Sequence, residues 1–326
     1  MMTRRLPEPP ERLSQVAFRR LSDDAREEYQ RQRFEFLGAE HLIQTPELEA
    51  TMREAQKILI RSSSISYVAR AGLALSGPST VGKSSTLLEI GRQHHRKVTE
   101  QAGKLHNREP VVYVSMGIAR TPKMALASFA DFLGLGFSSR ADTNTIGTAI
   151  ARVLNDLGTS LVIVDEIHNM SGVRRNESDG AATTLKWLTE HVNATFILAG
   201  IDLPSTAIFT GTMGTQFRGR FKIIQYPPCS NFSTTQRQAW TRLVASFESL
   251  LLGCLRDHEM GSLPAISDKI FELPTRSDTL GGIPLPHSIG TLKEMIVGAA
   301  IDAVLTGSEA VSLQDLANQN NLLSVR

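Results

Sequence analysis

Cysteine is nearly absent from this 326-residue chain, which has two, Cys229 and Cys254. Their separation matches no metal-ligand spacing, so we expect two reduced thiols and no disulfide framework. Long apolar runs are missing as well, because none reaches the length of a membrane span. The pair Arg4-Arg5 is soon followed by Pro-Glu-Pro-Pro, where a secretion signal requires an apolar block. The sequence therefore predicts a cytoplasmic protein that makes no membrane contact.

A strong excess of one charge is lacking too. The formal net charge is +2 at pH 7, which does not by itself indicate a partner such as nucleic acid, so any basic surface must be local. The apolar fraction of 41% and the charged fraction of 21% are those of an ordinary globular protein. A chain of this length can bury one large core and a smaller second one.

One stretch fits the phosphate-binding pattern G-x-x-x-x-G-K-[ST] without a mismatch. Glycines at both ends let the backbone curl so that successive N–H groups point at phosphates, and the helix that follows adds its positive end. Residues 72–76 read as a short buried strand and residues 84–96 as a helix, which is the context that the motif requires. The predicted nucleotide-binding residues are Gly77, Pro78, Ser79, Thr80, Val81, Gly82, Lys83, Ser84 and the adjacent Ser85.

Two acids end another apolar strand at residues 161–164. Ligands bind at the carboxyl ends of buried parallel strands. We expect Lys83 to contact the β- and γ-phosphates of ATP, and Ser84 and Asp165 to hold Mg²⁺. Glu166 is placed to polarise a water toward the γ-phosphate, which predicts hydrolysis. A histidine in the position of His168 more often orients or packs, so it is left out of the catalytic set.

Strands and helices alternate between residues 72 and 226, which predicts a mostly parallel, three-layer α/β sheet. Beyond it, a capping box at Ser233 and Gln236 and a helical apolar stripe predict a small all-helical region. Residues 1–45 are rich in proline and in charges of both signs, so we expect a solvated arm, or alternatively an arm that docks a partner. The predicted divisions are an arm at 1–44, a nucleotide-binding domain at 45–228, a helical lid at 229–306 and a tail at 307–326.

The phosphate loop, the two acids, an arginine pair before the fifth strand and the helical lid together resemble the AAA+ ATPases over residues 45–305. Within that superfamily the chain looks most like the transposition ATPases called TniB and TnsC. The resemblance implies that Arg220, or failing that Arg218, extends a finger into the nucleotide of the next subunit, although both also fit ordinary surface arginines. A finger acting in trans implies a homo-oligomeric ring or helical filament.

Two further roles follow from the same resemblance. Lys293 lies where the lid would offer a basic sensor residue, and a solvated helix lysine fits equally well. Arg120, Thr121 and Lys123 match residues that track a DNA backbone in the transposition relatives, so they would neutralise phosphates of double-stranded DNA without reading sequence; loop charges in water are the alternative. The fourth strand ends in Leu198-Ala199-Gly200, where the family often has a polar sensor, which makes fast hydrolysis less assured than nucleotide binding.

The functional expectation is an ATPase that assembles on DNA with ATP, recruits a transposase, and disassembles on slow, partner-stimulated hydrolysis, with a targeting adaptor as a possible further partner. The main alternative is an AAA+ or STAND-like switch that assembles proteins without DNA. A small-molecule kinase fits less well, because the two adjacent acids suit water activation. An initiator-type replication ATPase also fits less well, because about twenty residues follow the predicted lid, too few for a winged-helix domain.

Overall fold

The computed structural model describes residues 7–64, 70–102, 108–117, 119, 121–138, 140–170, 175–206, 208–273 and 288–324. The chain forms two compact units. The α/β unit consists mainly of Pro46–Pro227, and the helical unit combines Arg4–Thr45 with Pro228–Arg326. None of the helices described here is long and apolar enough to cross a membrane.

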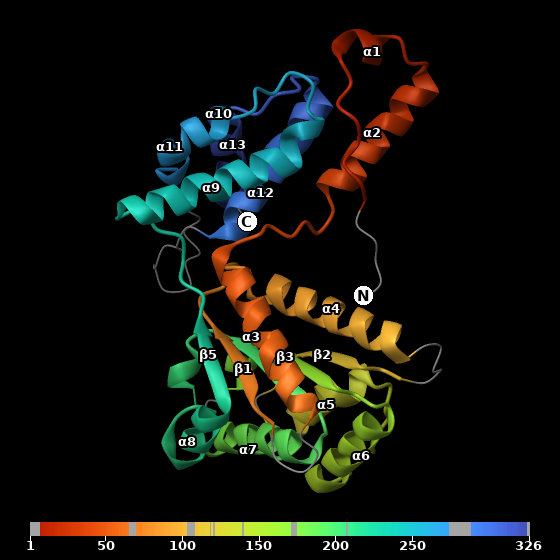
Figure 1. Ribbon diagram of the computed structural model, residues 1–326, viewed down its shortest axis with the longest axis vertical. Helices are drawn as coiled ribbons and strands as arrows, with labels where there is room; N and C mark the ends of the chain where they lie inside the picture. The colour runs from red at the N-terminus through yellow and green to blue at the C-terminus, as the bar shows by residue number, and fades with distance from the viewer. Residues whose placement is uncertain are drawn as a thin grey trace. The chain divides into compact units, whose positions relative to one another are not determined.

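The α/β unit is built on a five-stranded parallel sheet in the order β2-β3-β4-β1-β5 (Figure 1). Ser76 pairs with Gly200 and Ser115 pairs with Asp165, so neighbouring strands end level with one another. This arrangement gathers the carboxyl ends of the strands at one edge of the sheet. The strands are β1 (Gly72–Ser76), β2 (Val111–Ser115), β3 (Leu161–Asp165), β4 (Thr195–Gly200) and β5 (Phe221–Gln225).

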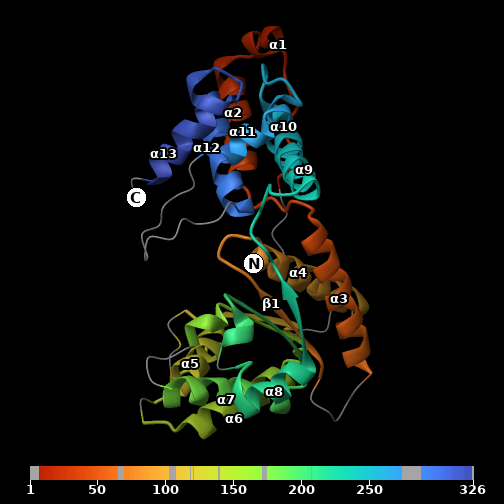
Figure 2. The same ribbon diagram turned by 90° about the vertical axis from the view of Figure 1, so that its left-hand side faces the viewer.

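Helices cover both faces of the sheet, which confirms the predicted three-layer α/β architecture (Figures 1 and 2). One face carries α3 (Pro46–Ser63) and α4 (Lys83–Ala102). The other face carries the longer helices α5 (Pro122–Phe132), α6 (Thr143–Asp156), α7 (Arg175–His191) and α8 (Gly211–Arg220), and the connections contain the short 3₁₀ turns η1 (Ile167–Met170) and η2 (Leu203–Ser205).

Alternating side chains of the strands pack into two separate cores, one on each face of the sheet. Leu73 and Leu75 of β1 pack with Ile58 and Leu87 of the α3 and α4 layer, while Ala74 belongs to the core on the opposite face. Successive side chains of a strand point to opposite faces, so a strand buried on both faces reads as a continuous apolar run. Each fully buried aliphatic side chain contributes about 1.5–3 kcal/mol relative to its exposed state.

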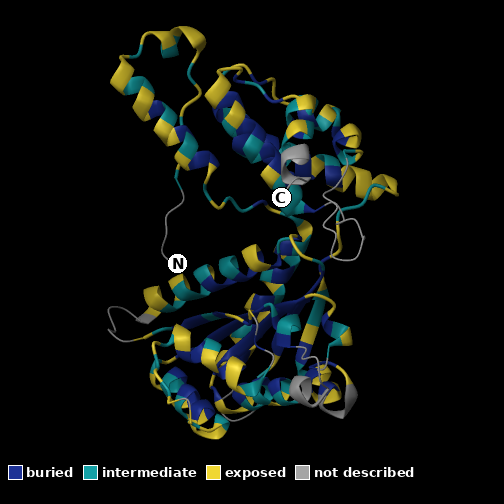
Figure 3. Cartoon of the chain, turned by 180° about the vertical axis from the view of Figure 1, so that it is seen from behind, coloured by how far each residue is buried: buried dark blue, intermediate teal, exposed yellow. Residues whose placement is uncertain are grey.

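The helical unit has a core of its own. The capping box at Ser233 and Gln236 starts α9 as predicted, and the buried faces of its helices are visible in Figure 3. Its elements are α1 (Gln15–Arg19), α2 (Asp23–Leu37), α9 (Thr234–Leu251), η3 (Leu252–Cys254), α10 (Ser262–Ala265), α11 (Ser267–Phe271), α12 (Ile289–Thr306) and α13 (Leu313–Ser324). The short helices α10 and α11 meet at Ile266.

The N-terminal segment differs from the expected solvated arm, because it is part of the helical unit. Phe36 and Leu37 of α2 are buried in the same core as α9 and α12. Buried Arg33 forms an ion pair with buried Glu309, and Arg256 binds the same carboxylate at 2.8 Å. Apart from Arg33, most charged side chains of α2 are exposed, while Tyr29, Phe36 and Leu37 are buried.

Candidate nucleotide-binding site

The loop between β1 and α4 has the geometry of a phosphate cradle. Gly77 N–H donates to the carbonyl oxygen of Gly200 at 3.2 Å, which fixes the start of the loop at the end of β4. A Cβ at Gly77 would lie 2.2 Å from the carbonyl oxygen of Tyr226, so this position requires glycine. Thr80 and Gly82 have positive φ values of 62° and 94°. The loop therefore curls as the sequence motif predicts.

Lys83 begins α4 and is only 6% exposed. Its Nζ donates to the carbonyl oxygens of Gly77 at 2.8 Å and Pro78 at 2.5 Å, so the ammonium group lies against the loop. Burial lowers the pKa of Lys83, and the negative charges of Asp165 and Glu166 oppose this effect. A bound polyphosphate would supply further negative charge where the ammonium group is least solvated.

Asp165, the last residue of β3, accepts hydrogen bonds from three donors. The hydroxyl groups of Ser84 and Tyr113 donate to its Oδ2 at 2.6 and 2.7 Å, and the N–H of Glu166 donates to Oδ1 at 2.8 Å. Burial raises the pKa of Tyr113, and the hydrogen bond to Asp165 raises it further. Tyr113 therefore remains a protonated donor throughout the physiological pH range.

The arrangement of Ser84 and Asp165 fits a magnesium–nucleotide complex. Their oxygen atoms are adjacent, and Mg²⁺ prefers oxygen ligands, keeps several waters, and takes further ligands from substrate phosphates. Within the described ranges no group of three or more His, Cys, Asp or Glu side chains could enclose a metal by itself. A hydroxyl and a single carboxylate beside a phosphate loop suit a metal that is shared with the nucleotide.

Glu166 follows Asp165 in a left-handed backbone conformation with φ of 59°. Its side chain is 42% exposed, and Oε2 lies 3.3 Å from Nε2 of His168. A carboxylate that is accessible to water, one residue beyond an aspartate that could bind a metal together with Ser84, can orient a water and accept its proton. The chemistry available at this end of β3 is therefore hydrolytic.

The two candidate finger arginines lie at the C-terminal end of α8. Arg220 Nη2 is 3.1 Å from Glu190 Oε1, and its side chain is 30% exposed. Arg218 Nη2 donates to the carbonyl oxygen of Pro204 at 2.8 Å. Both side chains have partners within the α/β unit and remain near its surface, so their predicted role in a neighbouring subunit stays a prediction.

The remaining predicted residues are spread over other elements. Ser85 is exposed in the first turn of α4. Lys293 lies on α12 of the helical unit. Burial lowers the pKa of His41, and the positive charge of Lys293 lowers it further. Thr121 caps α5 by accepting from Met124 N–H at 3.3 Å, and Lys123 Nζ donates to the carbonyl oxygen of Ala141 at 3.0 Å. Arg120 lies outside the described residues.

Tyr113 is a site residue that the sequence reasoning missed. Its hydroxyl reaches Asp165 because β2 pairs with β3 in parallel. A tyrosine in an otherwise aliphatic strand was the available signal, since a buried hydroxyl requires a partner.

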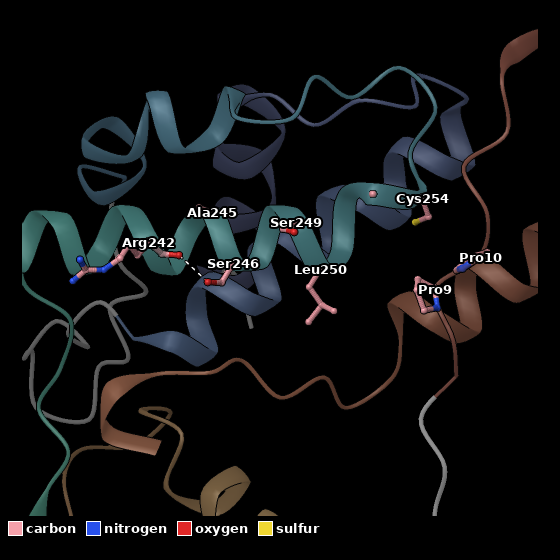
Figure 4. Close-up of a pocket in the computed structure, with 9 residues that line it drawn as sticks. Pro9, Pro10, Arg242, Ala245, Ser246, Ser249, Leu250 and Cys254 are labelled. Carbon is pink, nitrogen blue, oxygen red and sulfur yellow. Dashed lines mark hydrogen bonds between the residues drawn. The ribbon is translucent and has the colours of Figure 1, made fainter. Parts of the chain in front are cut away.

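A depression of about 720 Å³ occurs on the helical unit (Figure 4). Pro9 and Pro10 line it together with Arg242 and Ser246 of α9 and Cys254 of η3. Its lining contains no carboxylate, so it lacks the base needed for hydrolysis.

Comparison with known proteins identifies the family and the fold. A family profile described as "Bacterial TniB protein" matches residues 33–231, which is more than half of the chain. No curated protein sequence matches.

Solved structures share the architecture at low sequence identity. The Orc1 protein of Aeropyrum pernix in complex with DNA has a TM-score of 0.62 at 11% identity, over 88% of this chain and 67% of that one. The ORC2 protein of Aeropyrum pernix has a TM-score of 0.59 at 18% identity, over 90% of this chain and 71% of that one. Domain III of the replication initiation protein DnaA from Thermotoga maritima has a TM-score of 0.53 at 11% identity, over 87% of this chain and 95% of that one. The fold is thus that of the AAA+ P-loop ATPases with a helical domain.

Proposed function

Because the chain belongs to the TniB family, we propose that it is an ATP-hydrolysing regulator of transposition that assembles on duplex DNA. The observation that carries this proposal is the meeting of Ser84, Asp165 and the phosphate loop within a TniB-family chain. ATP and Mg²⁺ are the proposed cofactors. The proposed site of action is the cytoplasm.

In the proposed reaction the loop amides and Lys83 bind the phosphates, and Ser84 and Asp165 hold Mg²⁺, which would neutralise charge on the phosphate oxygens. Glu166 orients a water and accepts its proton as the water oxygen bonds to the γ-phosphorus. The bond from the γ-phosphorus to the bridging oxygen breaks, and ADP and phosphate leave. Arg220 of a neighbouring subunit would stabilise the charge of the transition state.

DNA binding is supported by a local basic group and not by the total charge of the chain. A total of +2 leaves most of the surface without electrostatic attraction for DNA. Thr121 and Lys123 lie at the start of α5, and Arg120 precedes them, so phosphates are the groups that this segment suits. The similar Orc1 structure is a complex with DNA, which supports the same class of ligand here.

We further propose that the ATP-bound assembly recruits a transposase, with a targeting adaptor as a second protein partner. Hydrolysis would then dismantle the assembly, slowly and under stimulation by these partners. In the rival proposal, the chain is a protein-assembly switch that binds no DNA.

Electron microscopy separates the two proposals. The protein is imaged with duplex DNA and a non-hydrolysable ATP analogue, with each alone, and with neither. Rings or filaments that need both ligands support the DNA-dependent assembly. Assemblies that form equally well without DNA would favour the protein-assembly switch. As a further check, the Glu166→Gln variant with ATP should give the same assemblies as wild-type protein gives with the analogue.

A further inference from the structure

The end of β4 carries no polar side chain of its own, yet an imidazole occupies the space beside it. His168 lies in η1, just after β3, and its Nδ1 accepts a hydrogen bond from Ile201 N–H at 3.3 Å. Ile201 directly follows the last residue of β4. His168 thus connects the loop after β3 to the end of the neighbouring strand.

Gly200 leaves room for this ring. A Cβ at position 200 would lie 3.2 Å from the backbone nitrogen of His168 and 3.3 Å from Nδ1. It would also lie 2.7 Å from Cδ2 of Leu203, which is too close for any real contact. A side chain at position 200 would therefore crowd both His168 and Leu203, and the glycine avoids this crowding.

The hydrogen bond that Nδ1 accepts determines which nitrogen of the ring carries the proton. A neutral imidazole has one donor nitrogen and one acceptor nitrogen, so a ring that accepts at Nδ1 carries its proton on Nε2. That nitrogen lies 3.3 Å from Oε2 of Glu166. His168 therefore accepts a hydrogen bond from the end of β4, and its Nε2 lies within contact distance of the carboxylate that is placed to activate water.

Glu166 depends on such a contact for its orientation. Its backbone is held by the hydrogen bond from its N–H to Asp165 Oδ1 and by Asn169 N–H, which donates to its carbonyl oxygen at 3.0 Å. These bonds fix the backbone but leave the torsions of the long side chain free to rotate. A partly exposed glutamate samples several rotamers unless a partner selects one. In the part of the site that the structure describes, His168 supplies that partner.

We propose that His168 is a positioning residue that couples the end of β4 to Glu166 and holds the carboxylate in the orientation that water activation needs. The proposal rests on the proposed hydrolysis of ATP by Glu166. His168 does not contact the reacting atoms, so its effect is on the rate of the chemical step and not on the binding of nucleotide.

Two amide substitutions separate the two contacts of the ring, the hydrogen bond from Ile201 and the approach to Glu166. In His168→Asn the side-chain oxygen can replace Nδ1 and accept from Ile201, but the side chain is too short to reach Glu166. In His168→Gln the amide nitrogen can replace Nε2 and donate to Glu166. Steady-state ATP hydrolysis, MgATP affinity and thermal unfolding are measured for both variants, for Glu166→Gln and for wild type.

We expect kcat to fall by about tenfold or more in His168→Asn and to stay closer to wild type in His168→Gln. KM, MgATP affinity and unfolding temperature should change little in either variant. A kcat for His168→Asn at or above the wild-type value would overturn the positioning role, and so would equal losses in the two variants. The proposed ATPase function survives those results if Glu166→Gln is inactive. If wild-type protein hydrolyses no ATP, both proposals fall.

Discussion

The hydroxyl of Ser84 lies 2.6 Å from Oδ2 of Asp165, although 81 residues separate them in the chain. Ser84 is in the first turn of α4, which follows β1, and Asp165 ends β3. Those strands are not neighbours, because β4 lies between them. The parallel order of the sheet therefore creates the contact and places both oxygen atoms beside the phosphate loop.

Replacing Ser84 with alanine should weaken the contribution of Mg²⁺ to ATP binding. Affinity in the presence of Mg²⁺ should fall by about 10-fold to 100-fold, while affinity in excess chelator should remain that of wild type. Titration calorimetry under both conditions measures the two values. Thr99→Ala, on the exposed side of the same helix, is the control and should bind as wild type does. A Ser84→Ala variant with an unchanged response to Mg²⁺ would argue against the metal site.

Removing Arg220 should reduce hydrolysis without reducing ATP binding. Loss of an arginine finger lowers turnover by about 10³-fold to 10⁵-fold, whereas loss of a partly exposed ion pair with Glu190 changes stability by about 1 kcal/mol or less. Turnover of Arg220→Ala is compared with that of Arg152→Ala, which removes an exposed arginine from α6.

Mixing tests whether the finger acts in trans. Arg220→Ala retains its own Glu166, and Glu166→Gln retains its own Arg220. An interface between the two variants therefore contains one complete site, and the mixture should regain part of the wild-type activity. A mixture no more active than its components would mean that Arg220 acts only within its own subunit, or not at all.

The double variant Arg120→Ala with Lys123→Ala should weaken binding to duplex DNA at every sequence tested. Each phosphate contact that is lost should reduce the slope of log affinity against log salt by about 0.9. Fluorescence anisotropy over a salt series gives this slope. Lys57→Ala with Arg152→Ala removes the same charge from α3 and α6 and serves as the control. Equal slopes in the two double variants would remove the assigned basic group from the DNA interface.

Glu309→Gln should destabilise the helical unit, because it leaves Arg33 and Arg256 buried without their carboxylate. Breaking a buried ion pair in this way costs about 3–5 kcal/mol. Denaturation is followed by the fluorescence of Trp240, which lies in this unit, in a Trp187→Phe background. Glu294→Gln, on the exposed side of α12, should unfold as the parent does. An equal stability for both variants would show that the N-terminal segment is held by apolar contacts alone.

The sequence predicts those parts of the site that are local in the chain. Gly77 to Ser84 carry their geometry in their own residue types, and the apolar run before Asp165, placed after a phosphate loop, predicts a buried strand. The parallel sheet follows from the alternation of such strands with helices. These patterns were sufficient for the fold, and they also yield the main candidate residues, because each pattern depends on neighbours within a few positions.

Contacts between residues far apart in the chain could not be predicted from local sequence patterns. Tyr113 meets Asp165 through strand pairing, and His168 meets the end of β4 through the glycine at position 200. The pairing of Arg33 with Glu309 joins residues 276 positions apart. Such partners are set by strand order and by tertiary packing, which no local pattern specifies.

The most direct test is the binding of MgATP to the purified chain, measured by calorimetry with wild type, Lys83→Ala and Lys222→Ala. Lys222 is an exposed lysine of β5 that pairs with Glu54. We predict saturable binding that requires Mg²⁺, is lost in Lys83→Ala and is unchanged in Lys222→Ala. No binding by wild type, or equal binding by wild type and Lys83→Ala, would contradict the account.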